Sequence, residues 1–488
     1  MGHLYTAIQR LLSHFNWWKI DSDLRRKIDE WHRADNHQKI IDTLEKIPET
    51  KRDFETTGLL ARAYNNIEDH ITAINLLESI REKGENDFLW NFRMGYTKYS
   101  LDQIREALRY FNRAVELDPT NDDARCFIRV CNLEIPFSKR VEDFWNWFVK
   151  NESELSGMIP PDSNDKANAL TAFVHEGTCL ISEKLFFYLG GDYEFTFSIE
   201  GWPDLFILYP HIISRMPQSL KNKWHFQPFN QGTDRPFGFR MYGTDIDTAR
   251  IMVRALYLED KNRFCISYYE QNLNALPKRE CDNFMWIILG HILGEGISFI
   301  YVDEIVPAEA IEDGMIPLSE LKGTMEMSVK AGGREFFDNP KDLYTGYQIS
   351  PQERDELRYD VIAGTTCLEG LVADYYNDST RIFDHINSFG AHAMFIAFRN
   401  IDCNDGDIPL DFRHELEDRL SNEILEPKQL GQVIGGATGV NMSYIDLIVF
   451  NRTAFINVIK PLLLQYKRYS FYLSDFKQHA EIIPLTEA

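Results

Sequence analysis

Residues 88–121, FLWNFRMGYTKYSLDQIREALRYFNRAVELDPTN, place small side chains at set positions within a 34-residue stretch. Gly95 and Ala107 fall where two consecutive helices would cross, and small side chains at a crossing let the helix axes approach closely. Phe111 would fill the space beside them. Pro119 would end the second helix, because proline lacks the N–H group that continues the hydrogen-bond ladder. The stretch therefore predicts two helices packed as one unit.

The order small, small, aromatic, small, proline, with Ala114 as the third small residue, resembles a tetratricopeptide (TPR) repeat. Residues 54–87 show the same pattern and place Ala61, Tyr64 and Ala73 at the expected positions.

The neighbouring segments extend this array. Residues 21–53 read as a degenerate repeat, residues 122–134 as a capping helix and residues 1–20 as a further helix. Because about three repeats are the minimum for a stable stack, the resemblance implies an all-α, TPR-like superhelix over residues 1–137.

A superhelix of this family implies a concave face that holds a peptide, a helix or another domain. Asparagine together with lysine or arginine on such a face can clamp the acidic end of a peptide. The candidates are the residues that we expect to be exposed on the first helix of each repeat: Arg62, Asn65, Asn66, Asn91 and Lys98.

The rest of the 488-residue chain is expected to hold further domains. Residues 138–168 read as a helical linker whose large rings are too many for one narrow face: Phe144, Trp145, Trp147 and Phe148. We expect this helix to lie between two domains.

Residues 169–330 are predicted to form an α+β domain with a mainly antiparallel sheet and helices on one face. Within it, residues 169–189 read as one helix that ends at a Gly-Gly pair, and residues 297–302 read as a strand.

Residues 331–488 are predicted to form a second α+β domain, whose first part, residues 331–390, reads as an irregular insertion. The remainder has the order β-α-β-β-α-β of the ferredoxin-like fold. It resembles uncharacterised bacterial α+β domains of the ribonuclease E regulator B type.

The composition favours an acidic cytoplasmic protein. The chain has 52 basic and 75 acidic residues, and because residues 1–137 hold 20 and 23 of these, the remainder holds 32 and 52. Such an acidic body disfavours nucleic acid and anionic membranes and favours a basic protein partner. The seven cysteines show no CxxC spacing. The sequence contains no apolar run long enough to predict a membrane span.

No motif predicts a metal, a cofactor or a catalytic residue. His291 and Glu295 lack the second histidine of a zinc protease motif, and Gly435 begins a glycine-rich hairpin that no helix follows. His385 and His392 flank a loop, and residues 404–407 form half of a calcium loop, but neither set supplies enough ligands.

The sequence therefore favours a non-catalytic adaptor or inhibitor that binds another protein, for example a basic toxin or nuclease. One alternative is a hydrolase-like enzyme with a site in residues 360–392. Another is a structural module that forms homo-oligomers through an exposed sheet edge. The polar residues that would serve the enzyme are Asp360, Thr365, Thr366, Asp384 and His385.

Overall fold

The computed structural model describes residues 20–354, 356–400 and 410–486, which form two compact units, Met1–Ile135 and Pro136–Ala488. The helix predicted at residues 1–20 and the calcium-like loop at residues 404–407 lie outside the described residues, apart from Ile20.

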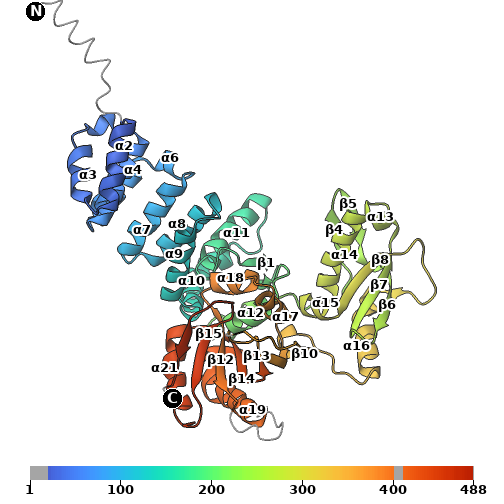
Figure 1. Cartoon of the computed structure of the whole chain (residues 1–488). Helices are drawn as coiled ribbons and strands as arrows, with labels where there is room; N and C mark the ends of the chain where they lie inside the picture. Colours follow the sequence, from blue (N-terminus) through green and yellow to red (C-terminus); the bar gives the residue numbers. More distant parts are fainter. Residues whose placement is uncertain (1–19, 355, 401–409, 487–488) are drawn as a thin grey trace, which may run out of the picture. The chain divides into compact units, whose positions relative to one another are not determined.

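The first unit is built from helices that pack against their neighbours along the chain (Figure 1). Their bounds are α2 Ser22–Arg33, α3 His37–Leu44, α4 Phe54–Asn66, α5 His70–Ser79, α6 Arg81–Gly84, α7 Phe88–Ser100, α8 Ile104–Leu117 and α9 Asp122–Glu134, with a 3-10 turn η1 at Glu49–Lys51.

Helix starts in this unit recur at a fixed interval. Asp53, Asp87 and Asn121 stand 34 residues apart, and each side chain accepts a hydrogen bond from the backbone N–H three residues on. Such a cap satisfies one of the N–H groups that a helix start leaves without a partner. The caps therefore set where α4, α7 and α9 begin.

The core positions repeat with the same interval. Ala61 and Gly95 are buried 34 residues apart, as are Ala73 and Ala107. A Cβ atom on Gly95 would lie 2.8 Å from the Phe111 ring, so α7 and α8 can pack this closely only because Gly95 has no side chain.

The other residues of the repeat pattern lie on α4, on α8 or just after α8. Ala114 is buried on α8, and Pro119 follows the end of α8 at Leu117. Tyr64 is half-buried on α4, and its hydroxyl donates a hydrogen bond to the Glu45 carboxylate.

The second unit is organised around a seven-stranded sheet in the order β10-β11-β13-β14-β12-β15-β16, in which all neighbouring strands are antiparallel. The strands are β10 Thr345–Gln348, β11 Val361–Thr366, β12 His392–Arg399, β13 Gly431–Gly439, β14 Met442–Val449, β15 Phe471–Asp475 and β16 Ile482–Pro484.

Helices cover both faces of this sheet (Figure 1). One face packs on α19 (Leu410–Arg419), the π-helical turn η5 (Leu420–Leu425) and α21 (Arg452–Leu463). The other face packs on four helices: α10 Phe137–Gly157, α12 Leu205–Ser214, α17 Glu369–Tyr376 and α18 Arg381–Ser388.

This arrangement changes two expectations. The helix expected to link domains, α10, buries Phe144, Trp145 and Phe148 in the largest core of the second unit, because its rings surround the helix and need cover on several sides. Residues 331–390 are not irregular: β10 and β11 extend the sheet, and α17 and α18 cover it.

The strands of residues 169–330 form three sheets instead of one. The first, β1-β2-β3, shares the largest core and includes a parallel pair, β2 with β3. Its elements are α11 Asn164–Thr178, β1 Phe186–Leu189, β2 Glu194–Ser198 and β3 His225–Gln227.

The other two sheets share a separate core. They are the hairpin β4-β5 and the sheet β8-β7-β6-β9. The elements are β4 Gly238–Met241, β5 Thr244–Asp247, β6 Met252–Leu258, β7 Arg263–Tyr269, β8 Val302–Pro307, β9 Ile316–Pro317, α13 Gln271–Asn274, α14 Lys278–Ile292, α15 Glu295–Tyr301 and α16 Leu321–Ala331.

Two predictions of local structure are wrong. The helix predicted at residues 169–189 ends at Thr178, and its last residues form strand β1. Residues 297–302 lie in helix α15 and enter a strand only at Val302, because a short apolar run fits a buried helix as well as a buried strand.

Candidate functional site

Two of the predicted binding residues of the first unit are not available to a partner. Asn65 is 4% exposed and donates to the Thr97 hydroxyl at 2.8 Å, and Asn91 is 2% exposed and donates to three backbone carbonyls, including that of Asp87 at 2.9 Å. The expectation that both are exposed is wrong, because buried amides are needed here to satisfy polar groups between helices.

The other three predicted residues remain accessible to different degrees. Asn66 is exposed at the end of α4. Lys98 is half-buried and pairs with Glu106 at 2.5 Å. Arg62 is half-buried, and its Nη2 atom lies 3.9 Å from Asp29 Oδ1. That Nη2 atom has no hydrogen-bond partner in the described structure.

Arg62 belongs to a row of arginines that the sequence did not reveal. Arg25 on α2, Arg62 on α4 and Arg93 on α7 influence one another electrostatically. Burial and the charges of Arg62 and Arg25 lower the pKa of Arg93 to about 10, although the charge of Asp87 acts in the opposite direction. In the described part of the chain, no ion pair or hydrogen bond joins the Arg93 guanidinium to another side chain.

The position of Arg93 depends on a glycine of the preceding hairpin. A Cβ atom on Gly58 of α4 would lie 2.6 Å from Arg93 Nη1, so the guanidinium rests directly against the α4 backbone. A desolvated cation without a partner is costly, and an anion bound beside it would restore the lost interactions. This row is the best anion-binding candidate of the first unit.

The residues of the alternative enzyme site do not converge. Asp360 accepts hydrogen bonds from the Tyr444 hydroxyl and two backbone N–H groups, and Thr365 is exposed on β11. Thr366 donates to the Ile434 carbonyl, and Asp384 faces outward, where it accepts from Thr380. Apart from Thr365, these side chains serve separate structural contacts.

His385 forms a buried dyad instead. Its Nδ1 atom lies 2.8 Å from Asp204 Oδ2, and its ring stacks on Trp202 with 3.8 Å between centroids. Asp204 Oδ1 has no hydrogen-bond partner in the described structure. The stacked imidazole and its carboxylate partner are both enclosed in the core.

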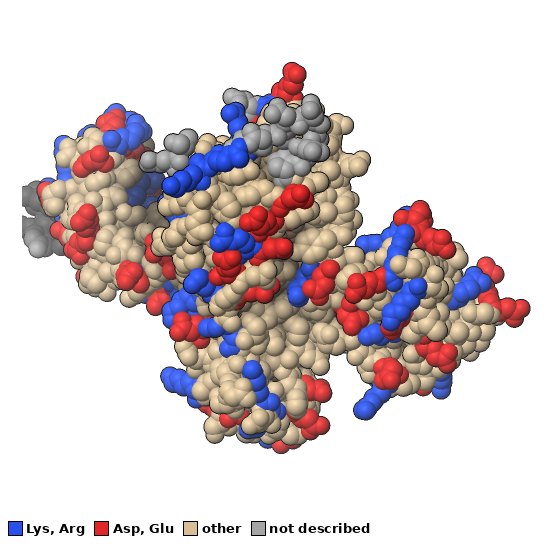
Figure 2. Space-filling model, turned by 90° about the horizontal axis from the view of Figure 1, so that it is seen from below, with Lys and Arg blue, Asp and Glu red and all other residues tan. Residues whose placement is uncertain are grey.

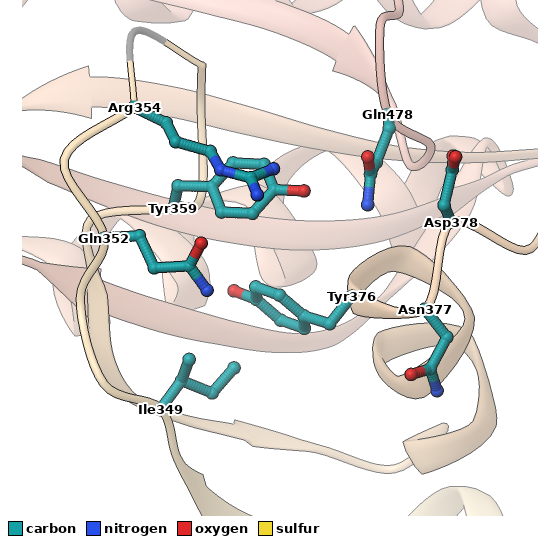
Figure 3. Close-up of a pocket in the computed structure, with 8 residues that line it drawn as sticks. All are labelled: Ile349, Gln352, Arg354, Tyr359, Tyr376, Asn377, Asp378 and Gln478. Carbon is teal, nitrogen blue, oxygen red and sulfur yellow. The ribbon is translucent and has the colours of Figure 1, made fainter.

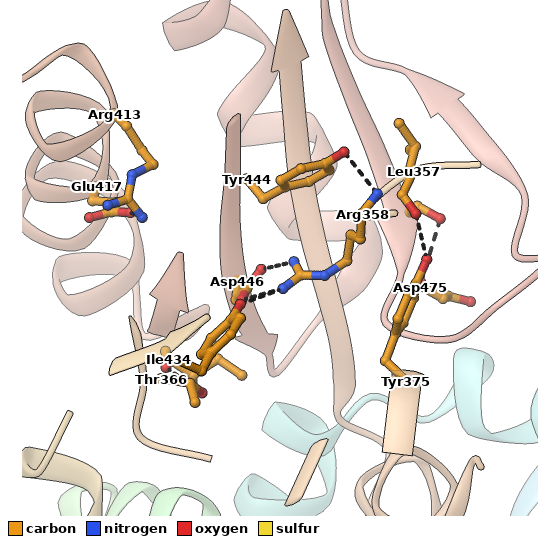
Figure 4. Close-up of polar contacts among 12 residues, drawn as sticks. Leu357, Arg358, Thr366, Tyr375, Arg413, Glu417, Ile434, Tyr444, Asp446 and Asp475 are labelled. Carbon is orange, nitrogen blue, oxygen red and sulfur yellow. Dashed lines mark hydrogen bonds and ion pairs between the residues drawn. The ribbon is translucent and has the colours of Figure 1, made fainter. Parts of the chain in front are cut away.

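The central polar feature of the second unit is an ion pair between Arg358 and Asp446 (Figure 4). Both side chains are at most 1% exposed. The Arg358 guanidinium also lies 4.4 Å from the Phe476 ring centroid. The backbone N–H of Arg358 donates to the Tyr444 hydroxyl at 2.8 Å. These contacts fix residue 358 against the sheet, although no local motif predicts the pairing.

A second charged pair, Arg413 and Glu417, lies against β13 on the α19 side of the sheet (Figure 4). A Cβ atom on Gly436 would lie 2.3 Å from both Arg413 Nη1 and Glu417 Oε1. Burial raises the pKa of Glu417 to about 7, although Arg413 acts in the opposite direction. The glycine-rich strand thus makes room for this charged pair.

A pocket of about 500 Å³ opens beside residues 349–359 and the end of α17 (Figure 3). Its lining combines one basic residue, one acidic residue, three side-chain amides, two tyrosines and one isoleucine: Arg354, Asp378, Gln352, Asn377, Gln478, Tyr359, Tyr376 and Ile349.

The remaining sequence candidates have structural partners. Glu295 accepts hydrogen bonds from the Ser198 hydroxyl and from the backbone N–H groups of Ile199 and Asn230, and His291 lies 2.8 Å from the Asn230 amide. No group of three or more metal-ligating side chains occurs among the described residues, and no disulfide joins the six described cysteines. Cys403 lies outside them.

Among the described helices, no single one is long and apolar enough to cross a membrane. Helices α14 and α15 reach that length and composition only together, and they are bent by 119° at their junction.

Charged side chains of both signs are interspersed on the face drawn in Figure 2, where Asp and Glu do not form one continuous acidic surface. The predicted acidic docking surface is therefore not visible on this face.

Comparison of the chain with protein-family models, with curated proteins and with solved structures gave no match. Function must therefore be inferred from the geometry of the chain itself.

Proposed function

We propose that the chain is a non-catalytic, cytoplasmic adaptor or inhibitor whose first unit binds an acidic segment of a partner protein. The observation that carries this proposal is the Arg93 guanidinium, which is desolvated beside Arg62 and Arg25. It forms no ion pair with a carboxylate among the described residues, although Asp87 acts on it electrostatically. Carboxylates of a bound peptide would supply charge-assisted hydrogen bonds to this row.

The regular spacing of the first unit supports a TPR-like array as the scaffold. Helix caps, small crossing residues and buried core residues each recur after 34 positions, which is the TPR period. Repeats of this kind present extended surfaces for protein partners.

The second unit would contribute a further contact. The strand order β13-β14-β12-β15, with two helices on one face, supports a ferredoxin-like arrangement in its last part. The excess of acidic residues after position 137 favours a basic partner surface, such as that of a toxin or nuclease. Because β11 and β16 pair with the outer sides of β13 and β15, those edges are not open to a second copy.

The test is fluorescence anisotropy of the full chain with a labelled, glutamate-rich decapeptide. Arg93→Gln should weaken binding about ten- to hundred-fold, because a hydrogen bond to a charged group contributes about 1.5–3 kcal/mol. The matched control is Arg26→Gln, which changes an exposed arginine of α2 that already pairs with Glu30. It should leave the affinity unchanged.

Two results would contradict the proposal. One is equal binding of the same peptide with glutamine in place of every glutamate. The other is an affinity that does not fall as ionic strength rises, since a partly exposed charge contact is screened by salt.

A further inference from the structure

The pocket of the second unit separates its two charged groups. Figure 3 shows Arg354 and Gln352 on one side, and Asn377, Asp378 and Gln478 on the other, with Tyr376 between them. Arg354 and Asp378 are both exposed, and neither has an ion-pair partner among the residues that the structure describes. The pocket therefore offers one cationic end and one anionic end.

The walls are held in place by hydrogen bonds. The Tyr376 hydroxyl donates to the Arg358 carbonyl at 2.9 Å, and Gln478 Nε2 donates to the Tyr375 carbonyl at 2.6 Å. The Arg354 guanidinium rests 4.5 Å from the centroid of the Tyr359 ring.

These walls are also tied to the core. Arg358 directly precedes Tyr359 of the pocket lining and is anchored by Asp446, so this part of the wall is held from inside the unit. A preorganised wall lowers the entropic cost of binding.

A ligand that satisfies this pocket must carry both charges. A simple anion would pair with Arg354 and be repelled by Asp378. A simple cation would pair with Asp378 and be repelled by Arg354. The three side-chain amides can donate to carbonyls and accept from N–H groups, which are the groups that a peptide bond presents. Because the charged groups come from opposite walls, the ligand's two charges should stand at its two ends.

We propose that this pocket binds short zwitterionic peptides. The terminal carboxylate pairs with Arg354, the terminal ammonium pairs with Asp378, and the amides of Gln352, Asn377 and Gln478 hydrogen-bond the peptide units between them. This site is independent of the arginine row of the first unit.

Isothermal titration calorimetry of the full chain with Ala-Ala-Ala tests the proposal. Amidating the carboxyl terminus or acetylating the amino terminus should each weaken binding at least about tenfold, since each removes one charge pair. Arg354→Gln and Asp378→Asn should do the same. Arg240→Gln, an exposed arginine on β4, is the control and should bind as the unchanged chain does.

The decisive comparison combines the two kinds of change. Arg354→Gln should cost no further affinity for the amidated peptide, and Asp378→Asn none for the acetylated peptide, because the matching charge is already absent. Additive losses in these pairs would overturn the proposal, as would equal affinity for free and doubly capped Ala-Ala-Ala or no binding at millimolar peptide. The capped peptides need no variant, so the test does not depend on how a variant folds.

Discussion

Arg358 and Asp446 form an enclosed, two-point ion pair, with 2.5 Å between Nη1 and Oδ1 and 3.2 Å between Nη2 and Oδ2. The two residues are 88 positions apart in the chain. Their pairing joins the segment before β11 to the middle of β14, and Tyr359, which lines the pocket, directly follows Arg358. The stability of the second unit and the shape of its pocket therefore depend on the same contact.

Asp446→Asn should destabilise the second unit strongly. Removing one partner leaves the Arg358 charge buried without compensation, which typically costs about 3–5 kcal/mol. The double change Arg358→Met with Asp446→Leu should cost clearly less, because no buried charge remains. Urea unfolding measures both, and a double variant as unstable as the single one would contradict this account. Lys330→Met, which breaks the exposed pair with Glu326, is the control and should leave the midpoint unchanged.

Glu417 should make stability depend on pH near neutrality. Its pKa is about 7 in the folded chain and near 4.5 when unfolded, so its contribution is complete below pH 4.5 and is lost as the pH rises through 7. Glu417→Gln should match the unchanged chain at pH 4 and exceed its unfolding free energy at pH 8 by up to about 3 kcal/mol. Denaturant titrations across this pH range test the prediction, with the exposed Glu423→Gln as the control. The prediction would be refuted if unfolding free energy depended on pH in the same way for Glu417→Gln and for the unchanged chain.

His392 should make the second unit sensitive to acid. Burial, together with the charges of Arg452 and Arg140, lowers its pKa to about 3 from 6.5. The neutral ring is therefore stabilising above pH 6.5, and that stability is lost as the pH falls toward 3, by about 1.4 kcal/mol per pH unit. His392→Leu should flatten the decline between pH 6 and 4 in thermal or urea unfolding. The exposed His225→Gln should not change it, and a slope that His392→Leu leaves intact would count against the assignment.

Gly95→Ala should loosen the first unit. The added methyl group would lie 2.8 Å from the Phe111 ring, and overpacking of this kind costs about 1–3 kcal/mol. Hydrogen exchange should become faster for backbone amides of α7 and α8. The matched control is Gly323→Ala in α16, where no atom beyond the adjacent residues and the helix's own nearby backbone lies within 4 Å of the new carbon. The backbone amides of α16 should exchange no faster in this control, because alanine favours a helix over glycine by about 1 kcal/mol. If each substitution made its own helix exchange faster, a specific clash at Phe111 would not be the cause.

Sequence patterns predicted elements whose determinants are local. The helices over residues 54–134 follow from small residues, caps and apolar spacing, and β12 to β15 follow from apolar runs between turn residues. The same patterns failed at residues 297–302, because a run of six apolar and small residues carries too little periodicity to separate a helix from a strand.

The candidate sites were harder to predict, because they depend on which surfaces meet. Asn65 and Asn91 look like exposed polar residues on helices, yet both are enclosed by neighbouring turns and helices. Arg93 resembles any surface arginine in the sequence, and only the approach of Gly58 and Arg62 makes it a desolvated cation. One feature of the sequence could have identified Arg93: it stands two residues before Gly95, on the helix face that is turned toward α4.

The sequence by itself determined the repeat length of the first unit and the order of strands and helices at the end of the second, since these depend on neighbouring residues and on turn chemistry. Only the tertiary structure decided that β10 and β11 join the same sheet, that Arg358 meets Asp446, and that Arg354 and Asp378 face one pocket. These relationships join residues that are far apart in the chain, and their free energy comes from desolvation and from complementary charge, neither of which a local pattern records.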